Sequence, residues 1–295
     1  MYKILANTVF LGKDIIYLTE CHSTNDEALE RLRRREISEG SIIFTDNQTK
    51  GRGQRGNVWL SQAGMNVTFS LLLKPNFLIP SEQFYLNMII SLSVVELFLG
   101  YSDDMKIKWP NDILHQSDGK IGGILIENII NQKGIEYSVI GIGLNINQTV
   151  FELPKVTSLR LLTGQDHERW EMLQILVANI ERRYMTLKKK EFKKIKSDYL
   201  AHLYRFEEWA MFDDGEIFEG KISRHQYPWH FHNWYTIIMV ESGSICYEFQ
   251  DMTLKVDEAE TLIIEPYKIH RNKISQPTTY KAIFLPLEYF EETIQ

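Results

Sequence analysis

A loop with three glycines and two arginines is the stretch of this chain best suited to chemistry. It runs from Gly51 to Gly56 and carries Arg52 and Arg55. Glycines let the backbone wrap closely around a ligand, and the two guanidinium groups bring fixed positive charge to the same loop. Guanidinium groups bind both carboxylates and phosphates, so this composition suits a mobile loop that closes over a carboxylate being joined to a phosphate.

The same residues also match the GxGxxG fingerprint of dinucleotide-binding proteins. That fingerprint requires a strand before it, a helix that opens at its last glycine, and an acidic residue about 20 positions later. The segment from Gly64 to Leu73 is instead rich in β-branched and aromatic residues and is bounded by turn residues. It predicts a strand and not a helix, so the dinucleotide interpretation is rejected.

Three short apolar runs further along the chain form a second candidate region. They lie at Lys106–Asp112, Gly119–Glu127 and Ile140–Asn147, and glycines interrupt the second and third. Glycine within a strand marks a place where another backbone or a ligand can approach closely, and Pro110 forces a sharp exit that leaves Asn111 and Asp112 at a strand tip. One such run alone is explained equally well by a tight turn; the set in this order favours a ligand site.

The elements that must position these residues predict an α+β fold, in which helices pack on a mixed sheet. The polar triplet Ser23-Thr24-Asn25 is expected to cap a helix. A strand at 41–45 delivers Gln48 to its end, and Glu82–Leu99 has a buried stripe at helical spacing. Residues 106–147 are β-rich, and two more helices are predicted over 168–188 and 191–204.

Composition narrows the class of protein. The chain has 295 residues, 44% of them hydrophobic and 24% charged, as in an ordinary globular protein with one large or two smaller domains. A formal charge of −6 argues against nucleic acid as a partner. The sequence has no run of membrane-spanning length and no signal peptide, and Cys21 and Cys246 are too few for a disulfide framework. We therefore expect a cytoplasmic protein without a membrane partner.

Together these motifs resemble the biotin protein ligases, which activate biotin with ATP and transfer it to a carrier-protein lysine. The resemblance covers about residues 1–220 and implies that family's sheet-and-helix fold, related to class II aminoacyl-tRNA synthetases. The matching residues are Ser23 to Asn25, Gln48, Gly51 to Gly56, Trp59, Lys108 to Asp112, Lys120 to Leu125 and Gly141 to Asn145.

The resemblance implies a site with ATP, Mg²⁺ and biotin, and with no metal bound by the protein itself. Arg52 and Lys120 would be catalytic. Residues that would bind biotin are Ser23, Thr24, Asn25, Gln48, Arg52, Gly53, Gln54, Lys120, Gly123, Gly141 and Gly143. Those that would bind ATP or the adenylate are Arg55, Trp59, Asn111 and Asn145. A common member of the family has arginine in place of Gln54, where it helps to retain the adenylate.

The implied macromolecular partner is a biotin carboxyl carrier protein, from acetyl-CoA carboxylase or a related carboxylase, and the implied ligase is a monomer or weak homodimer. Members of the family often carry an amino-terminal helix-turn-helix domain that represses biotin synthesis genes. The motifs here begin at Ser23 and leave no room for one, so no repressor role is expected.

The resemblance ends in the carboxyl-terminal part of the chain. We expect a catalytic domain at 1–205, the first hairpin of the family's usual barrel at 206–222, and a separate small β-rich module at 223–295. The last resembles the cupin-like sensing domains of arabinose-regulator-type transcription factors. His230, His232 and His270 follow a metal-site pattern. Metal-binding cupins place a glutamate where this chain has Thr236 and Ile237, so a packed histidine pair is favoured.

Two other functions stay open. One is a lipoate or octanoate ligase or transferase on the same fold. The other is a non-catalytic ligand sensor that works through the tail. The Lys-Trp-Pro-Asn-Asp and Gly-Arg-Gly motifs favour biotin, and intact Arg52, Lys120 and Asn111 argue against a degenerate ligase core.

Overall fold

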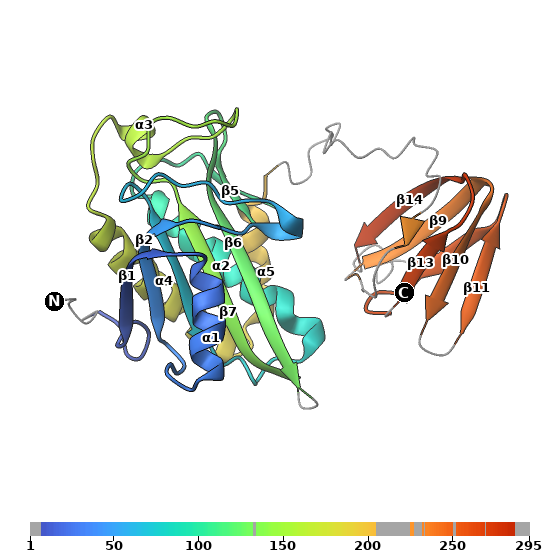
Figure 1. Ribbon diagram of the computed structural model, residues 1–295, viewed down its shortest axis with the longest axis horizontal. Helices are drawn as coiled ribbons and strands as arrows, with labels where there is room; N and C mark the ends of the chain where they lie inside the picture. The colour runs from blue at the N-terminus through green and yellow to red at the C-terminus, as the bar shows by residue number, and fades with distance from the viewer. Residues whose placement is uncertain are drawn as a thin grey trace. The chain divides into compact units, whose positions relative to one another are not determined.

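The chain divides into two compact units, Met1–Trp209 and Ala210–Gln295 (Figure 1). The computed structural model describes residues 7–131, 134–204, 225–226, 232, 234–249, 252–268 and 270–286. The hairpin predicted at 206–222, and His230, lie outside the described residues. The first unit carries the motifs of the predicted ligand site.

A seven-stranded mixed sheet forms the middle of the first unit, with strand order β1-β2-β3-β7-β6-β5-β4. Strands β1 and β2 pair in parallel, and the remaining neighbours pair antiparallel. This confirms the predicted mixed sheet. The strands are β1 (Ile15–Cys21), β2 (Ile42–Gln48), β3 (Val67–Leu73), β4 (Met105–Lys108), β5 (Asp112–His115), β6 (Gly119–Asn131) and β7 (Gly134–Leu144).

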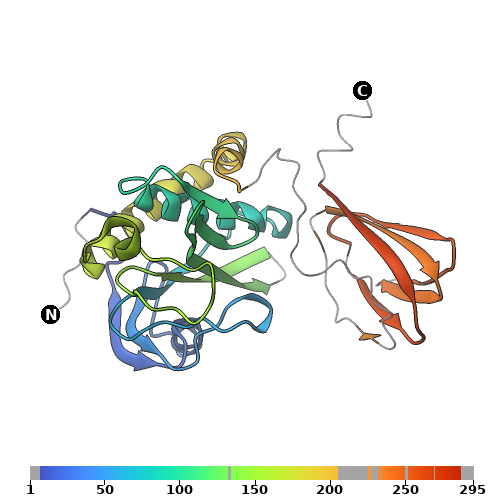
Figure 2. The same ribbon diagram turned by 90° about the horizontal axis from the view of Figure 1, so that it is seen from above.

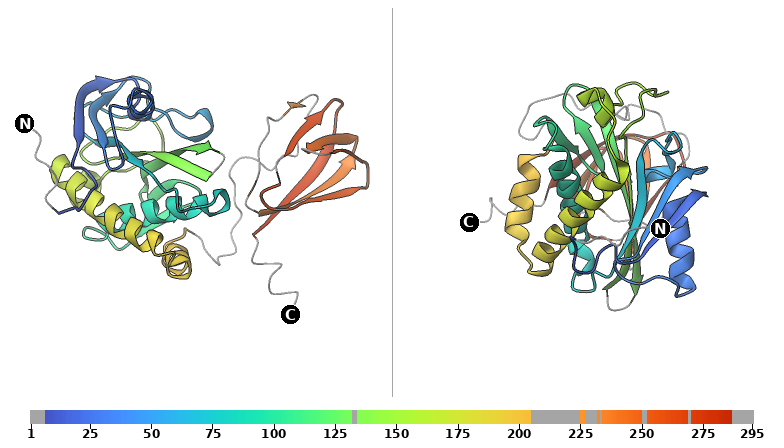
Figure 3. Two further views of the ribbon diagram at one scale, coloured as in Figure 1. Left: turned by 90° about the horizontal axis from the view of Figure 1, so that it is seen from below. Right: turned by 90° about the vertical axis from the view of Figure 1, so that its left-hand side faces the viewer.

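Helices cover both faces of this sheet (Figures 2 and 3). Helix α1 (Thr24–Arg33) packs on β2, β3 and β7. On the opposite face lie α2 (Gln83–Phe98), α4 (Arg169–Lys188) and α5 (Phe192–Ala201), while α3 (Leu159–Thr163) is a short turn of helix. The helices predicted over 82–99, 168–188 and 191–204 are confirmed, the last ending three residues early at Ala201.

Helix α2 is buried more widely than its sequence pattern predicts. The expected stripe, which includes Leu86, Ile90 and Val94, is buried, but Leu92 and Val95 outside the stripe are buried too. The reason is that α2 contacts the sheet on one side and both α4 and α5 on others. A helix enclosed in this way must be apolar nearly all round.

The second unit consists of two antiparallel sheets, which confirms the predicted small β-rich module. One has strand order β11-β10-β13-β8 and the other β12-β9-β14. Side chains of both sheets share a core that includes Val240 and Ile245. The strands are β8 (His225–Gln226), β9 (Trp234–Ser242), β10 (Ser244–Phe249), β11 (Thr253–Asp257), β12 (Thr261–Ile264), β13 (His270–Ile274) and β14 (Thr279–Pro286).

Two of the three histidines singled out in the tail pack together, with ring centroids of His232 and His270 5.3 Å apart. His270 is buried, and its Nδ1 lies 2.7 Å from the carbonyl oxygen of Lys268, so Nδ1 carries the proton that it donates. His232 stacks on Trp234. Within the described ranges, no cluster of three or more histidine, cysteine or acidic side chains is arranged to hold a metal ion.

Both cysteines, Cys21 and Cys246, are free thiols. Among the helices that the structure describes, none combines the length and the apolar character needed to cross a membrane.

Candidate active site

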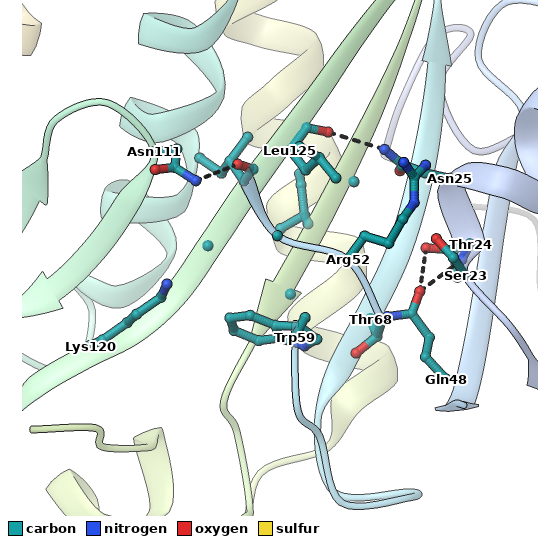
Figure 4. Close-up of a pocket in the computed structure, with 16 residues that line it drawn as sticks. Ser23, Thr24, Asn25, Gln48, Arg52, Trp59, Thr68, Asn111, Lys120 and Leu125 are labelled. Atoms are coloured by element: carbon teal, nitrogen blue, oxygen red, sulfur yellow. Dashed lines mark hydrogen bonds between the residues drawn. The ribbon is translucent and has the colours of Figure 1, made fainter. Parts of the chain in front are cut away.

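A pocket opens where the start of α1, the end of β2 and the glycine loop 51–59 meet strands β3, β6 and β7 (Figure 4). The empty space within it is about 450 Å³, part of which is open to solvent. The lining residues are Ser23, Thr24, Asn25, Gln48, Arg52, Gly53, Trp59, Thr68, Asn111, Lys120, Gly123, Ile124, Leu125, Gly141, Ile142 and Gly143.

Two glycines of β7 make the floor of the pocket flat. Gly143 pairs with Thr68 of β3 and with Gly123 of β6. A Cβ atom at Gly143 would lie 2.4 Å from Cε2 of Trp59, and one at Gly141 would lie 2.4 Å from Oδ1 of Asn25. Both distances are far below van der Waals contact, so the pocket needs glycine at each position.

The start of α1 is held by a side chain from the end of β2. Oε1 of Gln48 accepts from the backbone N–H of Thr24 at 2.7 Å and from its hydroxyl at 3.1 Å. The first N–H groups of a helix have no partner within the helix, and Gln48 satisfies one of them. Ser23 is the N-cap residue, but its side chain makes no capping bond. The predicted cap by one of Ser23, Thr24 and Asn25 is therefore wrong, because the acceptor comes from another element.

The glycine loop folds back on itself beside the pocket. The N–H of Gly53 donates to the carbonyl of Asn57 at 2.7 Å, and the N–H of Trp59 donates to that of Gly51 at 3.0 Å. A Cβ atom at Gly51 would lie 2.4 Å from the carbonyl oxygen of Trp59, so glycine permits this close return. The return places the indole of Trp59 over the glycine floor, where its Nε1 is buried.

The two predicted catalytic cations each form ion pairs with acidic side chains. Nζ of Lys120 lies 2.6 Å from Oδ1 of Asp112 and 5.6 Å from the ring centroid of Trp59. Nη2 of Arg52 lies 2.7 Å from Oδ1 of Asp26 and 2.8 Å from Oε2 of Glu127. All five charged side chains are partly exposed, so an anionic ligand can reach the cations and compete with these carboxylates.

The segment that forms this pocket also matches a described family. Residues 17–145 match the model of the biotin/lipoate A/B protein ligase family, and residues 214–295 match the AraC-like ligand binding domain. Through residues 17–145, the chain is thus similar to the biotin/lipoate A/B protein ligase family. The match to the tail agrees with the predicted cupin-like module.

Relatives of known name agree with this similarity. The bifunctional ligase/repressor BirA of Bacillus subtilis (strain 168) is 35% identical over 186 residues, which are 60% of this chain and 55% of BirA. Biotin–protein ligase 1, chloroplastic, of Arabidopsis thaliana is 35% identical over 144 residues, covering 46% of this chain and 37% of the relative. The chain thus spans 55% of the Bacillus protein and less of the plant protein.

Solved structures of biotin protein ligases have the same fold. The ligase from Aquifex aeolicus in complex with biotin and ATP is 25% identical with a TM-score of 0.56, covering 86% of this chain and 99% of that one. The ligase from Leishmania major in complex with biotinyl-5-AMP is 17% identical with a TM-score of 0.54, covering 83% and 98%. The predicted fold class is confirmed.

Most of the residues predicted for the site line this one pocket, and two whose side chains the structure describes, Gln54 and Asn145, do not. Gln54 lies in the loop but outside the lining. Asn145 is 2% exposed, and its Nδ2 donates to the carbonyl of Thr157 at 3.0 Å, which ties a following loop to the end of β7. The side chain of Arg55 lies outside what the structure describes. Nucleotide contacts by Asn145 and Arg55 stay predictions.

Several residues at the site were not predicted from sequence. Thr68 lines the pocket because β3 pairs with β7 opposite Gly143, and Leu125 lines it opposite Gly141. The acidic partners Asp26 and Glu127 face Arg52. Strand register brings Thr68, Leu125 and Glu127 to the site, and the packing of α1 on the sheet brings Asp26. A sequence motif does not contain that information.

Proposed function

We propose that the protein is an ATP-dependent biotin protein ligase, which forms biotinyl-5′-AMP and transfers biotin to a lysine of a biotin carboxyl carrier protein. One observation carries the proposal: Arg52 and Lys120 meet at a single glycine-floored pocket within the family-matched segment. The similar Aquifex aeolicus ligase, described in complex with biotin and ATP, supports this choice of substrates.

The proposed reaction requires two anions to meet. An oxygen of biotin's carboxylate attacks the α-phosphorus of ATP, the bond to pyrophosphate breaks, and a mixed anhydride forms. A lysine amine then attacks the anhydride carbonyl, AMP leaves, and the nitrogen loses a proton. Arg52 and Lys120 would stabilise the negative charge that gathers in the first step. The glycine loop would hold the reactants together and keep water from the anhydride.

The acidic residues near the pocket fit Mg²⁺ that arrives with the nucleotide. Magnesium is commonly held by one or two carboxylates together with substrate phosphates, and not by a cage of protein ligands. Asp112, paired with Lys120, is the carboxylate that would contribute. Bound there, the ion would neutralise phosphate charge.

The same proposal includes a carrier protein as the macromolecular partner. It also includes a monomeric or weakly dimeric ligase that does not bind nucleic acid. The free thiols of Cys21 and Cys246 support a reducing, cytoplasmic setting.

The decisive experiment is incubation of the protein with ATP, Mg²⁺, biotin and a carrier domain, followed by mass spectrometry of the carrier lysine. A mass increase that matches biotin, and that requires ATP, is the expected result. Lipoate and octanoate in parallel reactions test the second candidate, since the family model includes lipoate ligases. If the carrier lysine is acylated with lipoate or octanoate and not with biotin, the second candidate function replaces the proposed one.

The tail gives a further prediction. The second unit has its own hydrophobic core, and the pocket-lining residues that the structure describes all belong to the first unit. We therefore expect a chain that ends at Ile222 to form the adenylate within about twofold of the full-length rate, because separate domains fold independently. Pyrophosphate release measures the rate, and thermal unfolding checks the fold. A large loss in a folded truncated chain would give the tail a part in the reaction, contrary to this expectation.

We also expect the affinity for ATP to be low compared with that of ligases that keep the family's usual barrel. The resemblance assigns that barrel a contribution to nucleotide binding, and only its first hairpin is expected here. Titration of ATP at saturating biotin, side by side with such a ligase, measures the difference.

A further inference from the structure

Glu127 of β6 lies outside the pocket lining but contacts two side chains within it. Its Oε2 accepts from Nη2 of Arg52 at 2.8 Å and from Nδ2 of Asn25 at 2.7 Å. One carboxylate oxygen of β6 thus connects that strand to the glycine loop and to the start of α1. In Figure 4 the side chain of Arg52 extends from the loop toward Asn25.

Apart from the indole of Trp59 at its far end, which lies over the glycine floor, the loop has few other contacts that could hold it in place. Its three internal backbone hydrogen bonds, donated by Gly53, Asn57 and Trp59, close the loop on itself and do not tie its tip to the sheet. Val58 is 64% exposed. The ion pairs of Arg52 with Glu127 and Asp26 are therefore the contacts that fix its guanidinium beside the pocket.

Glu127 and Asp26 differ in what they hold. Asp26 is 54% exposed as a side chain and pairs with Arg52, whereas Glu127 is 29% exposed and also orients Asn25, a residue that is 2% exposed. The other end of the Asn25 amide, Oδ1, accepts from the hydroxyl of Ser70 at 2.6 Å. With both ends bonded, the amide of Asn25 has one orientation. Nδ2 of Asn25 also donates to the carbonyl of Leu125 at 3.3 Å, so Glu127 is the nearer of its two acceptors. A hydrogen bond between a charged group and a buried amide contributes more than an exposed ion pair.

We propose that Glu127 is a positioning residue that fixes Arg52 and Asn25 at the pocket before substrate arrives, with Asp26 as a second tether for the loop. Its effect on reaction rate rests on the proposed ligase function; its effect on the loop does not. A competing role is electrostatic: a carboxylate beside Arg52 could simply oppose anion binding. If Glu127 positions Arg52 and Asn25, its removal should slow the reaction. If Glu127 only opposes anion binding, its removal should strengthen that binding and speed the reaction.

The structural half of the proposal is tested by hydrogen exchange of the full-length protein without substrates. In Glu127→Ala and Asp26→Ala, the amides of the 51–59 peptide should exchange about tenfold faster, because local opening becomes easier. Glu136→Ala is the matched control, since Glu136 lies at the far end of the β6–β7 hairpin and accepts a bond from Asn131. Unchanged exchange in Glu127→Ala would overturn the proposal.

The kinetic half is tested by pyrophosphate release at saturating biotin. Glu127→Ala should lose about tenfold in rate, the scale of one hydrogen bond to a charged group. Glu127→Gln should lose less, because the amide keeps an acceptor oxygen. In the Arg52→Ala background, Glu127→Ala should cost less than it does alone, because the effect through Arg52 is already lost and only the effect through Asn25 remains.

A Glu127→Ala enzyme that is faster than the wild type would overturn the positioning role. So would a double variant whose loss in rate equals the two single losses combined. If the wild-type protein releases no pyrophosphate with biotin, the proposed function fails, and hydrogen exchange alone decides whether Glu127 holds the loop.

Discussion

Replacement of Lys120 by alanine should lower the rate of biotin-dependent pyrophosphate release by about a hundredfold or more, the scale of losing one group that stabilises transition-state charge. Nζ of Lys120 lies at the pocket, 2.6 Å from Asp112, and its side chain is 33% exposed. The ammonium is therefore accessible to a phosphate or carboxylate oxygen. Arg52→Ala should act in the same direction, because it removes the guanidinium that the loop brings to the same pocket.

The matched control for this prediction is Lys194→Ala. Lys194 also pairs with an aspartate, Asp198 at 3.2 Å, but it lies on α5 with 59% of its side chain exposed. It should leave the rate unchanged. Both lysine variants should unfold near the wild-type temperature, because exposed ion pairs contribute at most about 1 kcal/mol. Near-normal pyrophosphate release by a folded Lys120→Ala protein would exclude Lys120 from the chemistry.

Local patterns predicted the elements of the fold well. The helices at 82–99 and 168–188 have an apolar period that is contained in their own residues, and the structure has both. The extent of burial on α2 was not predictable in the same way. It depends on α4 and α5, which lie more than 70 positions later in the chain and cover the side of α2 away from the sheet.

The same distinction applies to the pocket. Arg52, Lys120 and the glycines at 141 and 143 stand in motifs, and the structure gathers them at one place. Glu127 also stands in a matched segment, but nothing in its neighbours along the chain shows that it faces Arg52. Its contact with Asn25 exists because β6 lies beside β7 and α1 packs on β7, and Arg52 reaches it from the loop that follows β2. The capping of α1 by Gln48 escaped prediction for the same reason, since helix caps are usually sought within the helix's own flanking residues.

Gly143→Ala should weaken biotin binding, and this is the second-largest effect that we expect. The added Cβ atom would lie 2.4 Å from Cε2 and 2.8 Å from Nε1 of Trp59, so the indole must move off the glycine floor. Overpacking of this kind typically costs about 1–3 kcal/mol, which predicts that biotin binds roughly fivefold to over a hundredfold more weakly. Isothermal titration calorimetry measures the dissociation constant. Gly100→Ala is the control, because the nearest atom to its Cβ is 4.0 Å away.

A double substitution tests whether Trp59 transmits the effect of Gly143→Ala. If the methyl group acts by displacing the indole, the change should cost little once the indole is removed. Gly143→Ala combined with Trp59→Ala should therefore bind biotin about as well as Trp59→Ala alone, because residues in direct contact are not additive. Full additivity of the two losses would show that the methyl group blocks biotin itself. The glycine at 143 would then be required by the ligand and not by the tryptophan.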